Sequence, residues 1–88
     1  MKMFVVDSFV EYSSVLSVEV ADGKCRALKK TTGSLKERSN QLLQLILMHR
    51  PEKLVFDEHG FGLGVKDQMI GLLSGANINI KENGTLTY

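Results

Sequence analysis

Several residue types are scarce in this chain, and each scarcity excludes a class of protein. A single cysteine, Cys25, rules out an intramolecular disulfide framework and a zinc site built from cysteines. Eleven lysine and arginine residues face ten aspartate and glutamate residues, so the net charge of +1 provides no field that would hold nucleic acid by charge alone. No apolar run approaches the length of a membrane-spanning helix. Asp7 interrupts the N-terminal apolar run too early for a secretion signal, and we expect a cytoplasmic protein that does not enter membranes.

The length and the composition predict one small domain. Hydrophobic residues make up 43% of the 88 residues and charged residues 24%, as in soluble globular proteins. A chain of this size buries a modest core, so self-association or docking to a partner protein would add useful burial to the single domain expected over residues 1–88. No Gly-x-x-x-x-Gly-Lys-Ser/Thr phosphate loop is present, which excludes a motor ATPase of that type.

The N-terminal third of the chain predicts three strands. Met3 to Val6 is a continuous apolar run closed by an acid, which is typical of a strand buried on both faces. Ser13 to Ala21 alternates apolar and polar residues, and Asp22-Gly23 offers the two positive-φ residues of a type I′ hairpin turn. The basic segment Lys24 to Lys30 is typical of an edge strand that charge protects against unwanted pairing.

A helix and a fourth strand are predicted next. Ser34 followed by Glu37 has the spacing of a capping box, and Pro51 predicts where the helix ends. Leucines and Ile46 recur at helical spacing, and the polar residues between them, Arg38 included, predict a face in water. Lys53 to Asp57 repeats the form of the first strand, and the helical connection favours a parallel pairing with it.

The C-terminal third predicts a second helix and a fifth strand. Val65 to Leu73 carries helical spacing and Ser74-Gly75 stops it, after which Ile78 and Ile80 alternate as in a strand. Asn83-Gly84 predicts a last hairpin into Thr85 to Tyr88. The predicted order is β-β-β-α-β-α-β, an α/β fold with a mixed sheet and helices packed on it.

Two acids follow the strands that are predicted to be parallel neighbours. Asp7 and Asp57 each stand at the carboxyl end of a strand, where they would face one crevice. Carboxylates that close repel each other unless a cation joins them, and Mg²⁺ or Mn²⁺ is the ion that prefers such oxygen ligands. A pair of ions there would clamp the two oxygens of a phosphodiester under attack. The alternative is that both acids cap turns where strands end.

These segments resemble a known superfamily. Val55 to Asp67 is similar to the segment of phage terminase large subunits in which a strand ends in an acid and glycines and a helix follow. Val5 to Asp7 and the acidic loop Glu11 to Ser14 resemble the first strand of the same nuclease domain and the loop after it, and Ser34 to Asp57 resembles Holliday-junction resolvases. The resemblance implies a ribonuclease H-like fold that cuts DNA with Mg²⁺ or Mn²⁺ during packaging. It assigns the first two catalytic acids to Asp7 and to either Asp57 or Glu58.

The chain departs from the pattern of this superfamily at its third acid. The superfamily places that acid beyond the fifth strand, where this chain has only Glu82. Glu11 would complete a three-acid metal site if its loop folds over the crevice, although an exposed loop glutamate more often faces solvent. A second hypothesis is therefore a reduced, non-catalytic relative that uses the same scaffold to bind nucleic acid or a protein partner.

Further residues are candidates for contact with nucleic acid. His59 could orient a water molecule or contact a phosphate. The alternative is that it is an exposed histidine of a turn with no functional role. Gly60, Gly62 and Gly64 stand between a strand and a helix, where backbone N–H groups could bind a phosphate of DNA or of a nucleotide. Turn geometry and close packing explain the same glycines. The densest basic patch, which either meets a phosphate backbone or is a solvated edge, comprises Lys24, Arg26, Lys29 and Lys30.

Overall fold

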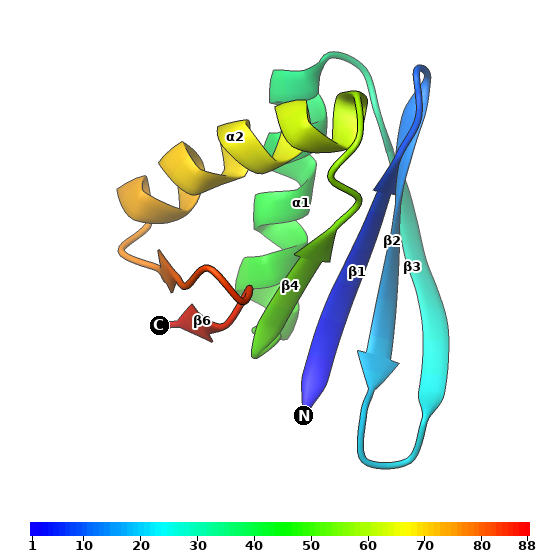
Figure 1. Ribbon diagram of the computed structural model, residues 1–88, viewed down its shortest axis with the longest axis vertical. Coiled ribbons are helices and arrows are strands. Elements are labelled where there is room, and N and C mark those ends of the chain that lie inside the picture. The colour runs from blue at the N-terminus through cyan, green and yellow to red at the C-terminus, as the bar shows by residue number, and fades with distance from the viewer.

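The protein is a two-layer α/β domain in a computed structural model that describes residues 1–88 (Figure 1). Both helices lie on the same side of the main sheet, and neither helix is long and apolar enough to cross a membrane. The elements in chain order are β1 (Lys2–Ser8), β2 (Tyr12–Glu19), β3 (Lys24–Thr32), α1 (Leu35–His49), β4 (Lys53–Phe56), α2 (Phe61–Gly75), β5 (Asn79–Ile80) and β6 (Leu86–Thr87). The predicted α/β class and the mixed sheet are confirmed.

The main sheet has four strands in the order β3-β2-β1-β4. β1 and β2 are antiparallel, as are β2 and β3. β1 and β4 are parallel, and their last paired residues are Val6 and Phe56. The parallel pairing that was predicted from the two apolar runs and the helix between them is therefore confirmed.

The predicted fifth strand does not extend this sheet. β5 pairs only with β6, in a separate two-stranded sheet. The segment leading into β6 lies against the start of β4, because Thr85 bridges Lys53 in antiparallel fashion and the Leu54 N–H donates to the Gly84 carbonyl at 2.9 Å. This close approach requires a glycine, since a Cβ on Gly84 would lie 2.3 Å from the Leu54 carbonyl oxygen.

Only one face of the sheet is covered. The alternating residues Phe4 and Val6 of β1 are fully buried beneath the helices, whereas Met3 and Val5 on the other face are half-buried. The expectation of a strand buried on both faces was wrong, because α1 and α2 share one side. The buried apolar core comprises Phe4, Val6, Val15, Leu42, Ile46, Leu54, Val65, Met69, Leu73, Ile78 and Leu86.

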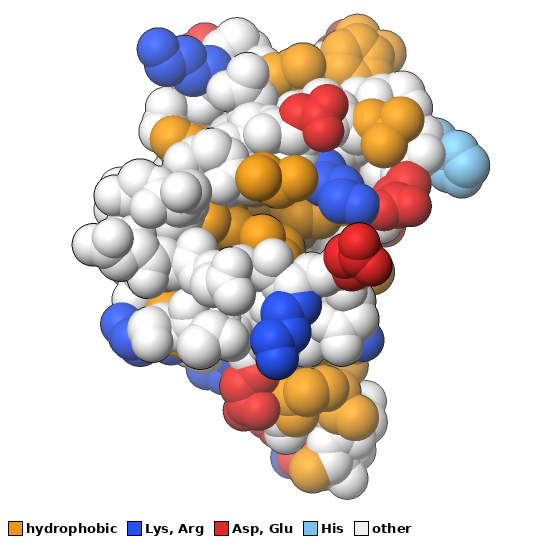
Figure 2. Space-filling view, turned by 60° about the vertical axis from the view of Figure 1, so that its left-hand side comes forward, with side chains coloured by type: hydrophobic (Ala, Val, Ile, Leu, Met, Phe, Trp, Pro, Cys, Tyr) orange, Lys and Arg blue, Asp and Glu red, His pale blue; other side chains and the backbone are white.

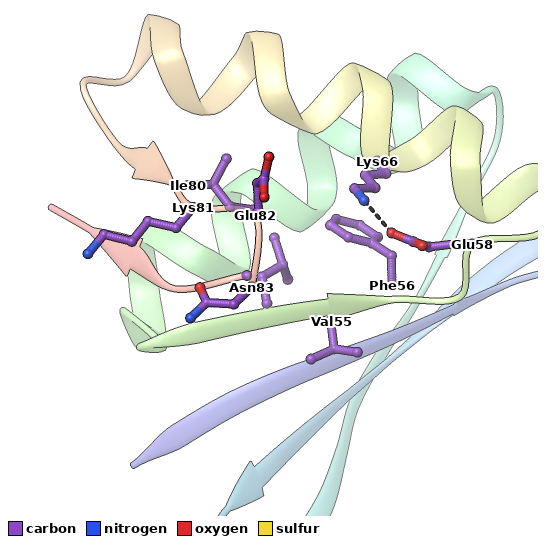
Figure 3. Close-up of a pocket in the computed structure, with 10 residues that line it drawn as sticks. Val55, Phe56, Glu58, Lys66, Ile80, Lys81, Glu82 and Asn83 are labelled. Atoms are coloured by element: carbon purple, nitrogen blue, oxygen red, sulfur yellow. Dashed lines mark hydrogen bonds and ion pairs between the residues drawn. The ribbon is translucent and has the colours of Figure 1, made fainter.

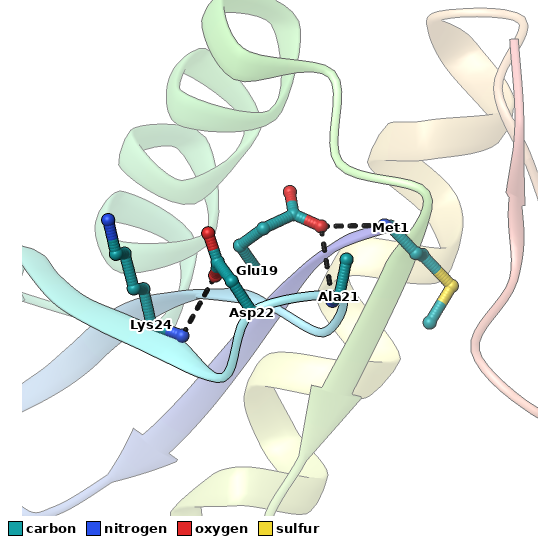
Figure 4. Close-up of polar contacts among 5 residues, drawn as sticks. All are labelled: Met1, Glu19, Ala21, Asp22 and Lys24. Atoms are coloured by element: carbon teal, nitrogen blue, oxygen red, sulfur yellow. Dashed lines mark hydrogen bonds and ion pairs between the residues drawn. The ribbon is translucent and has the colours of Figure 1, made fainter.

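The connection between β2 and β3 differs from the predicted two-residue turn. It spans residues 20–23, and of these only Gly23 has a positive φ, 69°. The Asp22 carboxylate accepts a hydrogen bond from the Lys24 N–H at 3.1 Å, and Glu19 accepts one from the Met1 ammonium at 2.7 Å (Figure 4). The side-chain acceptor of Asp22 closes a longer loop that needs only one left-handed residue, so the type I′ prediction was wrong.

The predicted capping box of α1 is confirmed. The Ser34 hydroxyl accepts a hydrogen bond from the Glu37 N–H, and the Glu37 carboxylate accepts one from the Ser34 N–H, both at 3.1 Å. The hydrogen bond from the Ser34 backbone lowers the pKa of Glu37 below its usual value of 4.5. The helix ends at His49, and the capping residue Arg50 takes a left-handed conformation with φ 47° directly before Pro51.

Candidate functional site

The ends of β1 and β4 meet at one edge of the main sheet. Because the two strands are parallel, the loop after β1 and the connection after β4 emerge side by side. A cavity of about 560 Å³ opens between them. Its lining residues are Ser8, Phe9, Val10, Glu11, Tyr12, Asp57, His59, Gly60 and Phe61. We call this the strand-end cavity.

Asp57 ties the two strand ends together. Its N–H donates to the Val6 carbonyl at 3.2 Å, which continues the β1–β4 pairing by one residue. Its two carboxylate oxygens accept the Ser8 N–H at 3.2 and 3.3 Å. The Ser8 hydroxyl is in turn 2.8 Å from the Ser13 hydroxyl of β2. The carboxylate of Asp57 therefore caps the end of β1, which is the structural role weighed against catalysis.

Asp7 lies beside Asp57 along the backbone but does not share its cavity. Each acid directly follows the last paired residues, Val6 and Phe56. The Asp7 side chain is exposed and alternates with Ser8, so it stands on the open face of the sheet. The cavity instead brings Asp57 together with Glu11 and His59.

Glu58 and Glu82 belong to a different part of the surface. Glu58 forms an ion pair with Lys66 of α2, and this hydrogen bond lowers the pKa of the carboxyl below its usual value of 4.5. Both glutamates line a second cavity, between β4, α2 and the C-terminal hairpin (Figure 3). No group of three or more His, Cys, Asp and Glu side chains is placed to hold a metal ion.

The glycines after Asp57 serve packing. α2 begins at Phe61, four residues before the predicted start, so Gly62 and Gly64 lie within its first turns and not in a loop. A Cβ on Gly62 would lie 1.9 Å from the Asp57 carbonyl oxygen, and one on Gly64 would lie 2.7 Å from Leu35 of α1. Gly60 precedes the helix with φ 51° and lines the strand-end cavity. Close approach of α2 to β4 and α1 explains Gly62 and Gly64.

Arg38 of α1 was predicted on the wet face of the helix, but it is a buried site residue. It is only 3% exposed. Its guanidinium donates to three backbone carbonyls: Nε to Gly33 at 2.9 Å, Nη1 to Phe9 at 2.5 Å, and Nη2 to Val10. Its Cζ also lies 5.7 Å from the centre of the Phe61 ring. Arg38 thus fixes the β1–β2 loop to α1 and to the start of α2.

The loop that Arg38 holds and the start of α2 expose apolar side chains to solvent. Phe9 is 49% exposed, Val10 70% and Phe61 41%. The Phe9 and Tyr12 rings stack at 5.0 Å, and the Phe9 N–H closes the loop by donating to the Tyr12 carbonyl at 2.7 Å. We call Phe9, Val10 and Phe61 the apolar lip of the strand-end cavity.

The predicted basic patch is only partly near this cavity. All four of its residues are exposed on the edge strand β3. Lys30 alone reaches the cavity rim, where its Nζ lies 4.7 Å from the centre of the Tyr12 ring. Cys25 is an exposed free thiol on the same strand. The basic strand and the strand-end cavity therefore meet at one point.

Comparisons with family models, with curated proteins and with solved structures found no match. The distinctive features of the site are a loop fixed by Arg38, an exposed apolar lip, and a cavity lined by Glu11, Asp57 and His59.

Proposed function

We propose that the chain is a reduced, non-catalytic relative of ribonuclease H-like nucleases, and that it binds a protein partner through the strand-end cavity. The observation that carries this proposal is the buried Arg38, which holds Phe9 and Val10 in place by their backbone carbonyls. Apolar residues on a loop are normally free to fold away from water. Here two hydrogen bonds from Arg38 fix the backbone of Phe9 and Val10 while their side chains remain exposed.

Preorganisation of this kind favours binding. Ordering a loop on association costs free energy, and a loop that is already fixed avoids that cost. Exposed apolar side chains around a concave polar centre are typical of interaction sites. The cavity volume of about 560 Å³ suits one large apolar or aromatic side chain of the partner, with Glu11 and His59 available for polar contacts at the rim.

A displayed library of random ten-residue peptides would test this proposal. We expect selection on the wild-type protein to enrich peptides with an aromatic or large aliphatic anchor. Val10→Asp should weaken their binding about tenfold or more, because a charge on the lip must lose its water on contact. Val20→Asp is the matched control, since Val20 is 48% exposed in the β2–β3 connection at the other end of the sheet. Equal binding by both variants would contradict the proposal.

A second candidate function is a Mg²⁺- or Mn²⁺-dependent DNA endonuclease. It is favoured by the gathering of Glu11, Asp57 and His59 in one cavity. Two carboxylates fit a single ion that keeps several water ligands, so Asp57 and Glu11 would hold the metal. Such an ion would polarise a phosphodiester oxygen and supply an activated water. His59 would accept a proton from that water, and Lys30 would contact the DNA backbone.

Metal-dependent nicking of supercoiled DNA tests the second candidate. We expect nicking with Mn²⁺ that Asp57→Asn abolishes and that Asp67→Asn leaves unchanged, because Asp67 is exposed on α2 outside the cavity. Paramagnetic Mn²⁺ should also broaden the NMR signals of Glu11 and Asp57 first. Nicking that persists in Asp57→Asn would refute the assignment. For either function we propose a cytoplasmic location, consistent with the exposed free thiol of Cys25.

A further inference from the structure

β4 is an edge strand over the second half of its length. The sheet order places β1 on one side of it only. On the other side, the C-terminal segment pairs with its first half, through Leu86 N–H to the Glu52 carbonyl at 2.8 Å and Leu54 N–H to the Gly84 carbonyl at 2.9 Å. These hydrogen bonds end at Leu54.

The backbone of Phe56 faces the same side as the Leu54 N–H. Asp57 N–H points to Val6 of β1, and backbone groups alternate along a strand, so the N–H and carbonyl of Phe56 point away from β1. The backbone hydrogen bonds outside the regular elements include none to Phe56. Unpaired groups of this kind form a template for a further strand.

A groove runs along this edge. A cavity of about 410 Å³ is bounded by Phe56 of β4, Lys66 of α2 and the segment from Ile80 to Gly84 (Figure 3). A second hollow of about 460 Å³ shares Lys66 and Ile80 with it and extends along α2 to Ile70. We call the two together the β4 groove. Figure 2 shows a hollow with apolar side chains in its depth and charged side chains of both signs around it.

The charges at the groove balance. Glu58 is ion-paired with Lys66 on one wall, and Lys81 and Glu82 stand next to each other on the opposite wall. The apolar side chains of Phe56, Ile80 and Ile70 form the floor of the groove. Phe56 and Ile80 are half-buried, and Ile70 is 47% exposed. A groove with no net charge and an apolar floor complements an uncharged, apolar occupant, and a charged one would lose its water without gaining a partner.

We propose that the β4 groove binds an extended, uncharged, apolar polypeptide segment of a partner protein, which adds to β4 as a further strand. Its backbone pairs with the N–H and carbonyl of Phe56, and one apolar side chain packs between Phe56 and Ile80. At about 3.3 Å per residue, roughly three residues span this edge. Backbone pairing supplies the affinity and the groove selects the side chain. This site is separate from the strand-end cavity and does not depend on its function.

One blocking variant, one matched control and the same displayed peptide library test this proposal. Peptides that bind the groove should be apolar and lack a central proline, and Ile70→Glu should weaken their binding about tenfold or more. Leu63→Glu is the matched control, because Leu63 lies on the same helix, is 45% exposed and lines neither cavity. The binding of peptides to the strand-end cavity should instead be weakened by Val10→Asp. The two proposed binding sites are therefore tested independently.

Amide exchange of Phe56 gives the decisive measurement. The selected peptide should slow hydrogen exchange at the Phe56 N–H about tenfold or more at saturation, and a version N-methylated at its central residues should not. The proposal would be overturned if the selected peptides left hydrogen exchange at Phe56 unchanged. It would also be overturned if the selection enriched no peptide whose binding Ile70→Glu weakens. Slowing of Phe56 exchange by raised protein concentration alone, with a doubling of mass in sedimentation, would replace the partner by a second copy of the chain and overturn it as well.

Discussion

Arg38 and Phe9 are 29 residues apart in the chain, and the guanidinium of the first donates a 2.5 Å hydrogen bond to the backbone carbonyl of the second. The same guanidinium also donates to Val10 and Gly33. A fully buried arginine usually pairs with a carboxylate, but this one is satisfied by backbone dipoles alone. One side chain of α1 thus holds the backbone of Phe9 and Val10, two of the three residues of the apolar lip.

Replacing Arg38 should release the β1–β2 loop and lower the free energy of unfolding of the domain. Arg38→Met keeps the apolar stem but leaves three carbonyls without their donor, so we expect a loss of about 3 kcal/mol in the free energy of unfolding. Urea denaturation measures it, and accelerated amide exchange in residues 9–12 reports the loop directly. Arg26→Met is the control, because Arg26 is exposed on β3 and should change stability by about 0.5 kcal/mol at most. A similar small change for Arg38→Met would contradict the role assigned to it.

Two glycines of α2 should respond to alanine in opposite directions. A Cβ at Gly62 would lie 1.9 Å from a backbone oxygen of Asp57, whereas a Cβ at Gly71 would meet nothing within 4 Å. Gly62→Ala should therefore cost about 2 kcal/mol or more, because backbone must shift. Gly71→Ala should add roughly 0.5 to 1 kcal/mol, since alanine restricts the unfolded chain and suits a helix. Thermal unfolding of the two variants checks both signs. A neutral Gly62→Ala would show that α2 does not pack this closely on Asp57.

Sequence patterns correctly predicted the elements whose formation depends on neighbouring residues. The capping box at Ser34 and Glu37 and the stop at Pro51 follow from residues close in sequence. The parallel pairing of β1 with β4 followed from two similar apolar runs joined by a helix. The predicted hairpin across Asn83-Gly84 is confirmed by the antiparallel pairing of β5 with β6. The separation of β5 from the main sheet did not follow from the sequence, because Ile78 and Ile80 alternate equally well in a main sheet or a small hairpin. Tertiary contact decided it, through the tight approach of Gly84 to Leu54.

The site was harder to predict than the fold. Arg38 was assigned to water because arginine is usually exposed, although it stands three residues after Leu35 and four before Leu42, on the apolar face of α1. That spacing is the signal that could have identified it. The hydrogen-bond partners of Arg38 are backbone carbonyls. Every residue has a backbone carbonyl, so no sequence pattern indicates which ones accept these bonds. Glu58 lines a different cavity from Asp57 because its carboxylate pairs with Lys66, eight residues further along the chain. Lys66 lies on α2, a helix whose start was predicted four residues late.

The capping box should make stability depend on pH. The folded pKa of Glu37 is lowered below 4.5, so its contribution is present above that pH and is lost as the pH falls through the folded value. Glu37→Gln keeps a neutral acceptor, so the wild type should be the more stable protein at about pH 7 and lose that advantage towards about pH 3. Urea denaturation at both pH values measures the difference. Ser34→Ala, which removes the other half of the box, should cost about 1 kcal/mol at pH 7. A constant difference between wild type and Glu37→Gln would rule out the ionic contribution.

Tyr88 should give the opposite pH dependence at the alkaline end. Its hydroxyl donates to the Pro51 carbonyl at 2.6 Å, and burial raises its pKa above 10.0 despite the Arg50 guanidinium 4.4 Å from the ring centre. A raised folded pKa stabilises the protein below pH 10 and ceases to do so as the pH rises through the folded value. Tyr88→Phe should therefore cost about 1 kcal/mol near neutral pH, and the cost should shrink above pH 10 because the ionised hydroxyl cannot donate. The chain has two tyrosines, so the Tyr12→Phe variant isolates Tyr88 for titration by tyrosinate absorbance. Tyr88 that titrates at or below 10.0 in this folded variant would show that the hydroxyl is not held against Pro51.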